Sequence, residues 1–142
     1  MLEKKLCGGY MAEKLTVAGE EWLITIAEMS SPEMKPVRIG ELADRLHAAP
    51  SSASRMARNL ALGGYIDFQR YGYIFLTDSG REESEYLMRR RQTVRDFLAK
   101  FTSRSVAECV REAREIEHGL SRESVFAMEK FLSGGGEGEY ST

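Results

Sequence analysis

Residues 39–77, IGELADRLHAAPSSASRMARNLALGGYIDFQRYGYIFLT, decide the fold. Apolar residues recur at i, i+3, i+4 and i+7 from Ile39 to Leu46 and again from Ala53 to Leu60, which predicts two short amphipathic helices. The short segment between them ends in Pro50, and proline fits the first turn of a helix because its missing N–H is not needed there. Two short helices joined by a tight turn are typical of a helix-turn-helix.

A β-hairpin is predicted directly after the second helix. Gly63-Gly64 ends that helix, and residues 65–69 and 73–76 are rich in aromatic and β-branched residues on either side of Arg70-Tyr71-Gly72. Outside this stretch, helical spacing predicts helices over 17–30, 78–100 and 106–116, and a last helix after Ser121. The sequence therefore predicts a mainly α protein, with a winged helix-turn-helix followed by a helical region.

Composition excludes several classes of protein. The 142 residues contain no apolar run of membrane-spanning length and no signal peptide, which predicts a cytoplasmic protein. Cys7 and Cys109 are too far apart in sequence for a zinc motif and form no disulfide framework. With two histidines, no Ser/His/Asp set and no phosphate-binding glycine loop, the chain is not expected to be an enzyme.

Positive charge is concentrated in the predicted helix-turn-helix and wing. Residues 35–76 hold six Lys or Arg and three Asp or Glu, a balance of +3, although the whole chain carries −2. A basic segment on an acidic body provides a local phosphate-binding face. The expected DNA-binding residues are Arg38, Pro50, Ser51, Ser52, Ser54, Arg55, Arg58, Arg70 and Tyr71.

Five stretches carry a resemblance to a known family. They are Glu20–Leu23, Ile39–Ala43, Pro50–Ser54, Leu76–Gly80 and Ile116–Ser121. Together with the order of elements from about residue 15 to residue 132, they resemble the diphtheria-toxin-repressor and manganese-transport-regulator (DtxR/MntR) family, in the short form without a C-terminal barrel. The resemblance implies a homodimer built through the helices after the wing, a palindromic double-stranded DNA operator, and a repressor.

The resemblance also implies a divalent metal, Mn²⁺ or Fe²⁺, bound by residues of three helices. Glu21, Glu117 and His118 match ligand positions. Ile24, Arg91 and Arg114 stand where further ligands are expected, and an arginine cannot ligate a metal because its guanidinium stays protonated. The residues therefore predict a degraded metal site and no required cofactor, and an ion-pair set in which Glu21, Arg91, Arg114 and Glu117 converge.

With this resemblance, the chain divides into four parts. We expect a flexible arm over 1–14, the DNA-binding domain over 15–77, a dimerisation (formerly metal-sensing) domain over 78–132, and a disordered tail over 133–142. The stripe expected at the dimer interface consists of Val106, Cys109, Val110 and Ala113. Two alternatives stay open: a metal-responsive repressor with an atypical site, and a winged-helix protein-interaction module without specific DNA binding.

Overall fold

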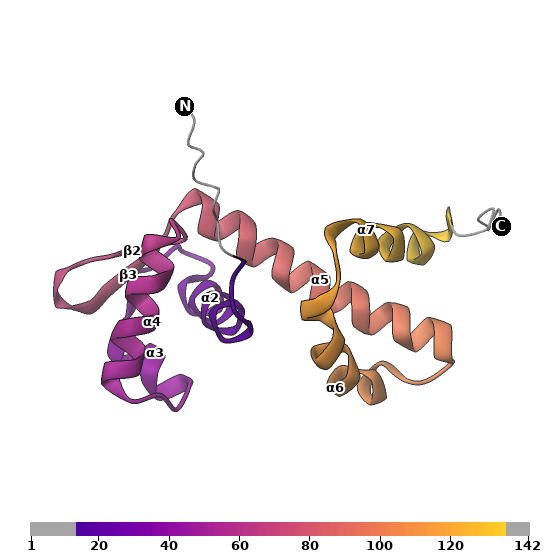
Figure 1. Ribbon diagram of the computed structural model, residues 1–142, viewed down its shortest axis with the longest axis horizontal. Helices are drawn as coiled ribbons and strands as arrows, with labels where there is room; N and C mark the ends of the chain where they lie inside the picture. The colour runs from indigo at the N-terminus through magenta and orange to yellow at the C-terminus, as the bar shows by residue number, and fades with distance from the viewer. Residues whose placement is uncertain (1–13, 136–142) are drawn as a thin grey trace. The chain divides into compact units, whose positions relative to one another are not determined.

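The computed structural model describes residues 14–135, which form two compact units. The division falls after Glu85, inside a helix (Figure 1). Most of the predicted arm over 1–14 and most of the predicted tail over 133–142 lie outside the described residues. Residues 133–135 belong to a final helical turn. Within the described residues, no helix is long and apolar enough to span a membrane.

Three helices form the body of the first unit: α2 (Val17–Ser30), α3 (Ile39–Arg45) and α4 (Pro50–Leu62). Their bounds confirm the predicted helix-turn-helix, with Pro50 in the first turn of α4. The predicted apolar spacing also marks the core, because Leu23 and Ile26 of α2, Leu42 of α3 and Leu60 of α4 are all buried. This burial fixes which face of α4 remains exposed.

A three-stranded antiparallel sheet completes the first unit. The hairpin of β2 (Ile66–Phe68) and β3 (Tyr73–Leu76), joined by the turn η2 (Arg70–Gly72), confirms the predicted wing. The strand β1 (Val37–Arg38) pairs with β3, placing Val37 opposite Ile74 and Arg38 opposite Tyr73. The sequence does not predict β1, since two residues are too few to show an alternating pattern.

Two glycines fix the ends of the hairpin. At the wing turn, Gly72 has φ +80°, and a Cβ there would lie 2.6 Å from Cγ2 of Ile39. At the other end, a Cβ on Gly80 would lie 1.8 Å from the carbonyl oxygen of Tyr65. Only a residue without a side chain lets the start of the next helix approach the hairpin this closely.

Side-chain caps at helix N-termini divide the helices into two groups. Thr16 caps α2, Thr77 accepts from the N–H of Gly80 at the start of α5, and Ser121 caps α7. Ser105 and Glu108 form a capping box on α6, and the bonds from Ser105 lower the pKa of Glu108. The helices α3 and α4 have no side-chain cap hydrogen bond.

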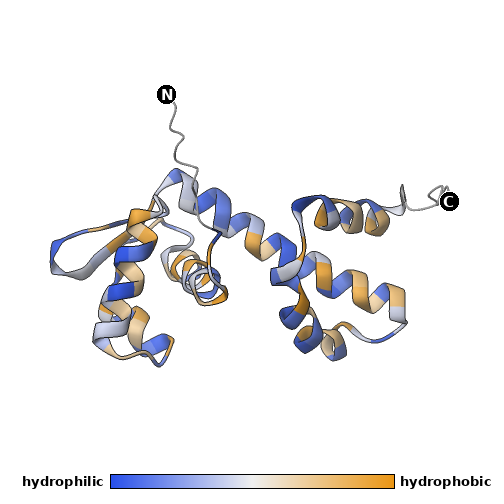
Figure 2. Cartoon of the chain, in the orientation of Figure 1, coloured by the Kyte–Doolittle hydropathy of each residue, from blue (hydrophilic) through white to orange (hydrophobic). Residues whose placement is uncertain are grey.

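The second unit is helical. The helix α5 (Asp78–Thr102) enters it from the first unit and is followed by α6 (Val106–Ile116), the turn η3 (Glu117–Gly119), α7 (Arg122–Lys130) and the turn η4 (Phe131–Gly135). Phe97 joins α5 to the last turn, with its ring centroid 5.3 Å from that of Phe131. Hydrophilic and hydrophobic stretches alternate along the helices of both units (Figure 2).

Of the four residues predicted at the dimer interface, two are buried within the chain and two are exposed. Cys109 and Ala113 are buried within the single chain, so they cannot contact a second copy, and their assignment to the interface is wrong. Val106 and Val110 are 44% and 42% exposed. The reason is geometric: the buried line of α6 runs at four-residue spacing through Cys109, Ala113 and Glu117, and the two valines lie at its edge.

Candidate DNA-binding face and metal centre

The helix α4 presents a polar face without any acidic residue between Pro50 and Leu62. Ser51, Ser52, Arg55 and Arg58 are exposed, whereas Ser54 is only partly so. Since Ala49 offers no capping side chain, the first N–H groups of α4 can meet a phosphate oxygen. Hydroxyl and guanidinium groups next to such a helix N-terminus can bind both base edges and the phosphate backbone.

The wing adds a second set of exposed groups. Arg70 and Tyr71 are exposed at its tip, where Tyr71 has φ +67° and a side chain that projects into solvent. Arg38 lies on the edge strand, where its Nη2 donates to the Tyr73 hydroxyl at 2.7 Å and its guanidinium stacks 5.1 Å from the ring centre. This contact leaves the exposed Arg38 guanidinium oriented by an aromatic ring, as suits a phosphate contact.

One residue of this face was missed by the sequence analysis. Asn59 is exposed on α4, and it follows Ser52 by seven residues and Arg55 by four, so the three share one face. An asparagine amide can bind the N6 and N7 atoms of adenine together. The same helical spacing that placed Arg55 on this face would have identified Asn59.

In the second unit, a buried carboxylate is paired with a guanidinium. Nε and Nη2 of Arg91 donate to Oε1 of Glu117 at 3.1 and 3.0 Å. The Glu117 side chain is 0% exposed and that of Arg91 is 19% exposed. Both bonds run from one guanidinium to the same carboxylate oxygen, so they orient an ion pair between α5 and η3.

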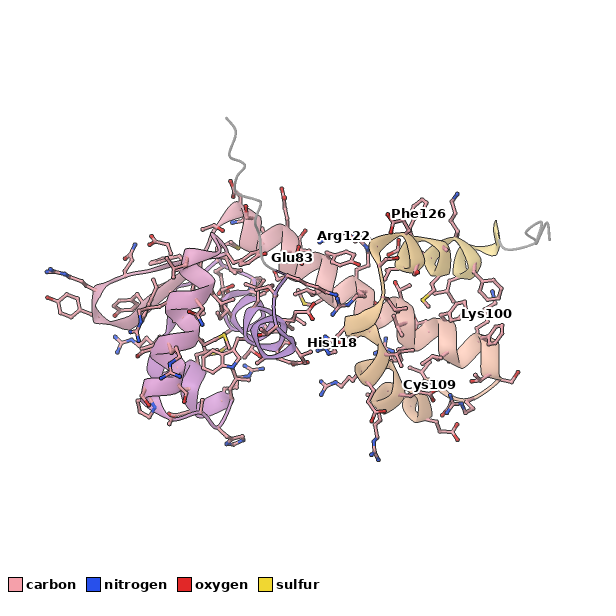
Figure 3. The ribbon with its side chains drawn as sticks, in the orientation of Figure 1. Glu83, Lys100, Cys109, His118, Arg122 and Phe126 are labelled. Carbon is pink, nitrogen blue, oxygen red and sulfur yellow. The ribbon has the colours of Figure 1, made fainter. Side chains whose placement is uncertain are left out.

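His118 lies between Arg90 and Glu117. Nη2 of Arg90 lies 3.3 Å from Nδ1 of His118, and because a guanidinium only donates, Nδ1 must be the acceptor. The other ring nitrogen, Nε2, lies 3.7 Å from Oε1 of Glu117. Figure 3 labels His118 at the turn that follows α6. We call Arg90, Arg91, Glu117 and His118 the arginine cluster.

The predicted ion-pair set is confirmed at Arg91 and wrong at Arg114. Arg114 is exposed, and no carboxylate pairs with it within residues 14–135. It follows the buried Ala113 directly, so it points about 100° away from the line that buries Glu117. The second guanidinium of the cluster is instead Arg90, which is 3% exposed and lies between the buried Leu87 and Val94 at helical spacing.

Glu21, the remaining predicted ligand, lies on α2 in the first unit, whereas Glu117 and His118 lie in the second. Its convergence with Arg91 and Glu117, and the set Glu21, Glu117 and His118 as metal ligands, therefore stay predictions.

Comparison with known proteins assigns both parts of the chain. Residues 14–74 match the N-terminal DNA-binding domain of iron-dependent repressors, and residues 77–134 match their metal-binding and dimerisation domain. The chain belongs to the iron-dependent repressor family. This assignment confirms the DtxR/MntR resemblance and favours DNA recognition over an interaction module.

Individual proteins that resemble this chain agree with the assignment. An uncharacterized HTH-type transcriptional regulator of Methanocaldococcus jannaschii is 30% identical over 113 residues, covering 80% of this chain and 90% of that protein. The regulator MntR of Geobacillus kaustophilus is 30% identical over 84 residues, 59% of each chain. A manganese-dependent transcriptional repressor in complex with manganese has a TM-score of 0.67 at 28% identity, covering 81% of this chain and 52% of that one. A hypothetical protein of Sulfolobus solfataricus shares the fold, with a TM-score of 0.72 at 18% identity over 89% of this chain and 93% of that one.

The residues of the arginine cluster do not fit the divalent metal that the family implies. Arg91 binds Oε1 of Glu117, and Nη2 of Arg90 lies 3.3 Å from Nδ1 of His118. Two guanidinium groups lie beside the carboxylate and the imidazole of this cluster. A divalent ion bound by these residues would lie beside fixed positive charge, which opposes its binding.

Proposed function

We propose that this protein binds a palindromic double-stranded DNA operator as a homodimer and represses transcription from it. The observation that carries the proposal is the exposed face of α4, which has two arginines, three serines and no acidic residue. The helix α4 lies within residues 14–74, which match the DNA-binding domain of iron-dependent repressors, and this supports insertion of α4 into the major groove. Such a regulator acts in the compartment that holds the DNA, which we propose is the cytoplasm.

Within this proposal, the residues divide by role. Arg55 and Arg58 contact base edges, since a guanidinium can bind guanine through two hydrogen bonds. Ser51, Ser52 and Ser54, together with the α4 N-terminus that Pro50 begins, contact phosphate or bases at the start of the helix. Arg38, Arg70 and Tyr71 contact the backbone or the minor groove beside the wing.

A matched set of variants tests these roles on duplexes selected from random DNA. Arg55→Ala should weaken binding to the selected site by about 1–3 kcal/mol because a base contact is lost, and Arg55→Lys should restore charge but not the two-bond geometry. Arg70→Ala should weaken selected and random duplexes equally and lower the salt slope by about 1. Fluorescence anisotropy at several salt concentrations measures both effects. Parent-like binding by both alanine variants would show that α4 and the wing are not the reading face.

The homodimer is proposed to form through the exposed edge of α6. Val110→Glu should convert the dimer to monomer because it places a carboxylate in an apolar contact next to Val106. Arg111→Glu is the control, since this neighbouring side chain is 92% exposed and lies off the apolar edge. Sedimentation equilibrium measures the mass of each variant. A monomeric parent protein would contradict the homodimer, and a dimeric Val110→Glu variant would contradict this interface.

A further inference from the structure

We propose that Arg91 is the built-in cation of this protein's dimerisation domain, so that its fold and its operator binding need no divalent metal. The claim about operator binding rests on the proposed function, whereas the claim about the fold of the domain does not. The inference is carried by the pairing of Arg91 with a carboxylate that is fully buried.

The first step is the need for a positive partner at this position. Glu117 belongs to the second unit, in a domain matched as metal-binding, and its side chain is 0% exposed. A carboxylate removed from water needs a cation or hydrogen-bond donors to remain ionised. Among the described residues, its other oxygen, Oε2, has no hydrogen-bond partner, so the pairing at Oε1 is the main compensation.

The second step is that Arg91 supplies this cation permanently. The guanidinium is attached to α5 and stays protonated at any physiological pH, so its presence does not vary with metal concentration. Its two bonds join residues 26 positions apart in sequence, on α5 and η3. A metal ion in this position would hold α5 and η3 together only while it was bound. Arg91 holds them together at all times.

Arg90 acts on His118, the second candidate metal ligand in this unit. Its Nη2 lies 3.3 Å from Nδ1 of His118, and Nε2 of the same ring lies 3.7 Å from the oxygen that Arg91 already binds. A histidine needs an available nitrogen lone pair to ligate a metal. A divalent ion would therefore have to compete with both guanidinium groups for Glu117 and His118.

The test compares the parent protein with Arg91→His and Arg114→His. The first variant removes the paired guanidinium and adds an imidazole beside Glu117, and the second makes the same change at an exposed arginine outside the cluster. Isothermal titration calorimetry with MnCl₂ and ZnCl₂ alone, without DNA, measures metal binding directly. We expect no stoichiometric binding by the parent or by Arg114→His, and affinity at least about tenfold higher for Arg91→His.

A second measurement uses the parent protein and the selected duplex. Anisotropy with EDTA and with MnCl₂ should give dissociation constants within about twofold of each other, since no metal takes part. Stoichiometric binding of either metal by the parent, lost in Glu117→Gln, would overturn the inference, as would a tenfold loss of operator affinity in EDTA. If the parent bound no selected duplex under either condition, the proposed function would fail, and the titrations without DNA would still decide the role of Arg91.

Discussion

Arg91→Met is expected to lower the free energy of unfolding by about 3–5 kcal/mol, because it leaves the carboxylate of Glu117 buried without its guanidinium partner. Methionine keeps much of the volume of the arginine stem, so the loss reflects the missing charge more than a cavity. Urea denaturation followed by circular dichroism measures the change.

Two further variants separate the ion pair from its parts. Arg114→Met, the same substitution at an exposed arginine, should change stability by less than about 0.5 kcal/mol. The double variant Arg91→Met/Glu117→Met should recover most of the loss, since replacing a buried ion pair by apolar residues is often close to neutral. If Arg91→Met were as stable as Arg114→Met, the buried pair would have no structural role.

Gly80→Ala is expected to cost about 3 kcal/mol, at the upper end of the usual range for overpacking. A Cβ at this position would lie 1.8 Å from the backbone oxygen of Tyr65, which no side-chain rotation can relieve. The start of α5 would have to move away from the hairpin, breaking the bond of 3.1 Å from the Thr77 N–H to the same oxygen. Thermal unfolding measures the loss of stability.

The control is Gly40→Ala, at a glycine of α3 where a Cβ would meet nothing within 4 Å. Alanine favours helix over glycine by up to about 1 kcal/mol, so this variant should be as stable as the parent or more stable. Equal stability of the two alanine variants would mean that α5 can shift without cost, contrary to the close approach described here.

Periodicity was sufficient to predict the elements that position the DNA-binding face. The apolar spacing within residues 39–60 and the turn residues Arg70–Gly72 determine local structure, so the helix-turn-helix and wing followed from them directly. The strand β1 did not follow, because its two residues become a strand only by pairing with β3. The sequence therefore predicted local structure better than it predicted pairing between distant segments.

The candidate metal centre was predicted only in part for a similar reason. The resemblance pointed to Arg91 and Arg114, but it carries no information on which of them is buried. That depends on the packing of α6, which buries the line through Cys109, Ala113 and Glu117 and leaves Arg114 in solvent. The position of Arg90 between Leu87 and Val94 at helical spacing was a usable signal, because those two residues are apolar and buried.

The uncapped helices α3 and α4 have a consequence for the energetics of recognition. In the other α-helices of residues 14–135, a serine or threonine of the chain itself satisfies the first amide groups. In α4 a backbone phosphate of the DNA can accept hydrogen bonds from these amide groups, so that the duplex caps the helix. By analogy with a side-chain cap, this contact would contribute ~1 kcal/mol to the binding free energy. Every DNA sequence carries the same phosphates. Completion of the helix would therefore raise the affinity for non-specific DNA and for the operator equally. It would help the protein to stay on the chromosome while it searches, and it would add nothing to specificity for the operator.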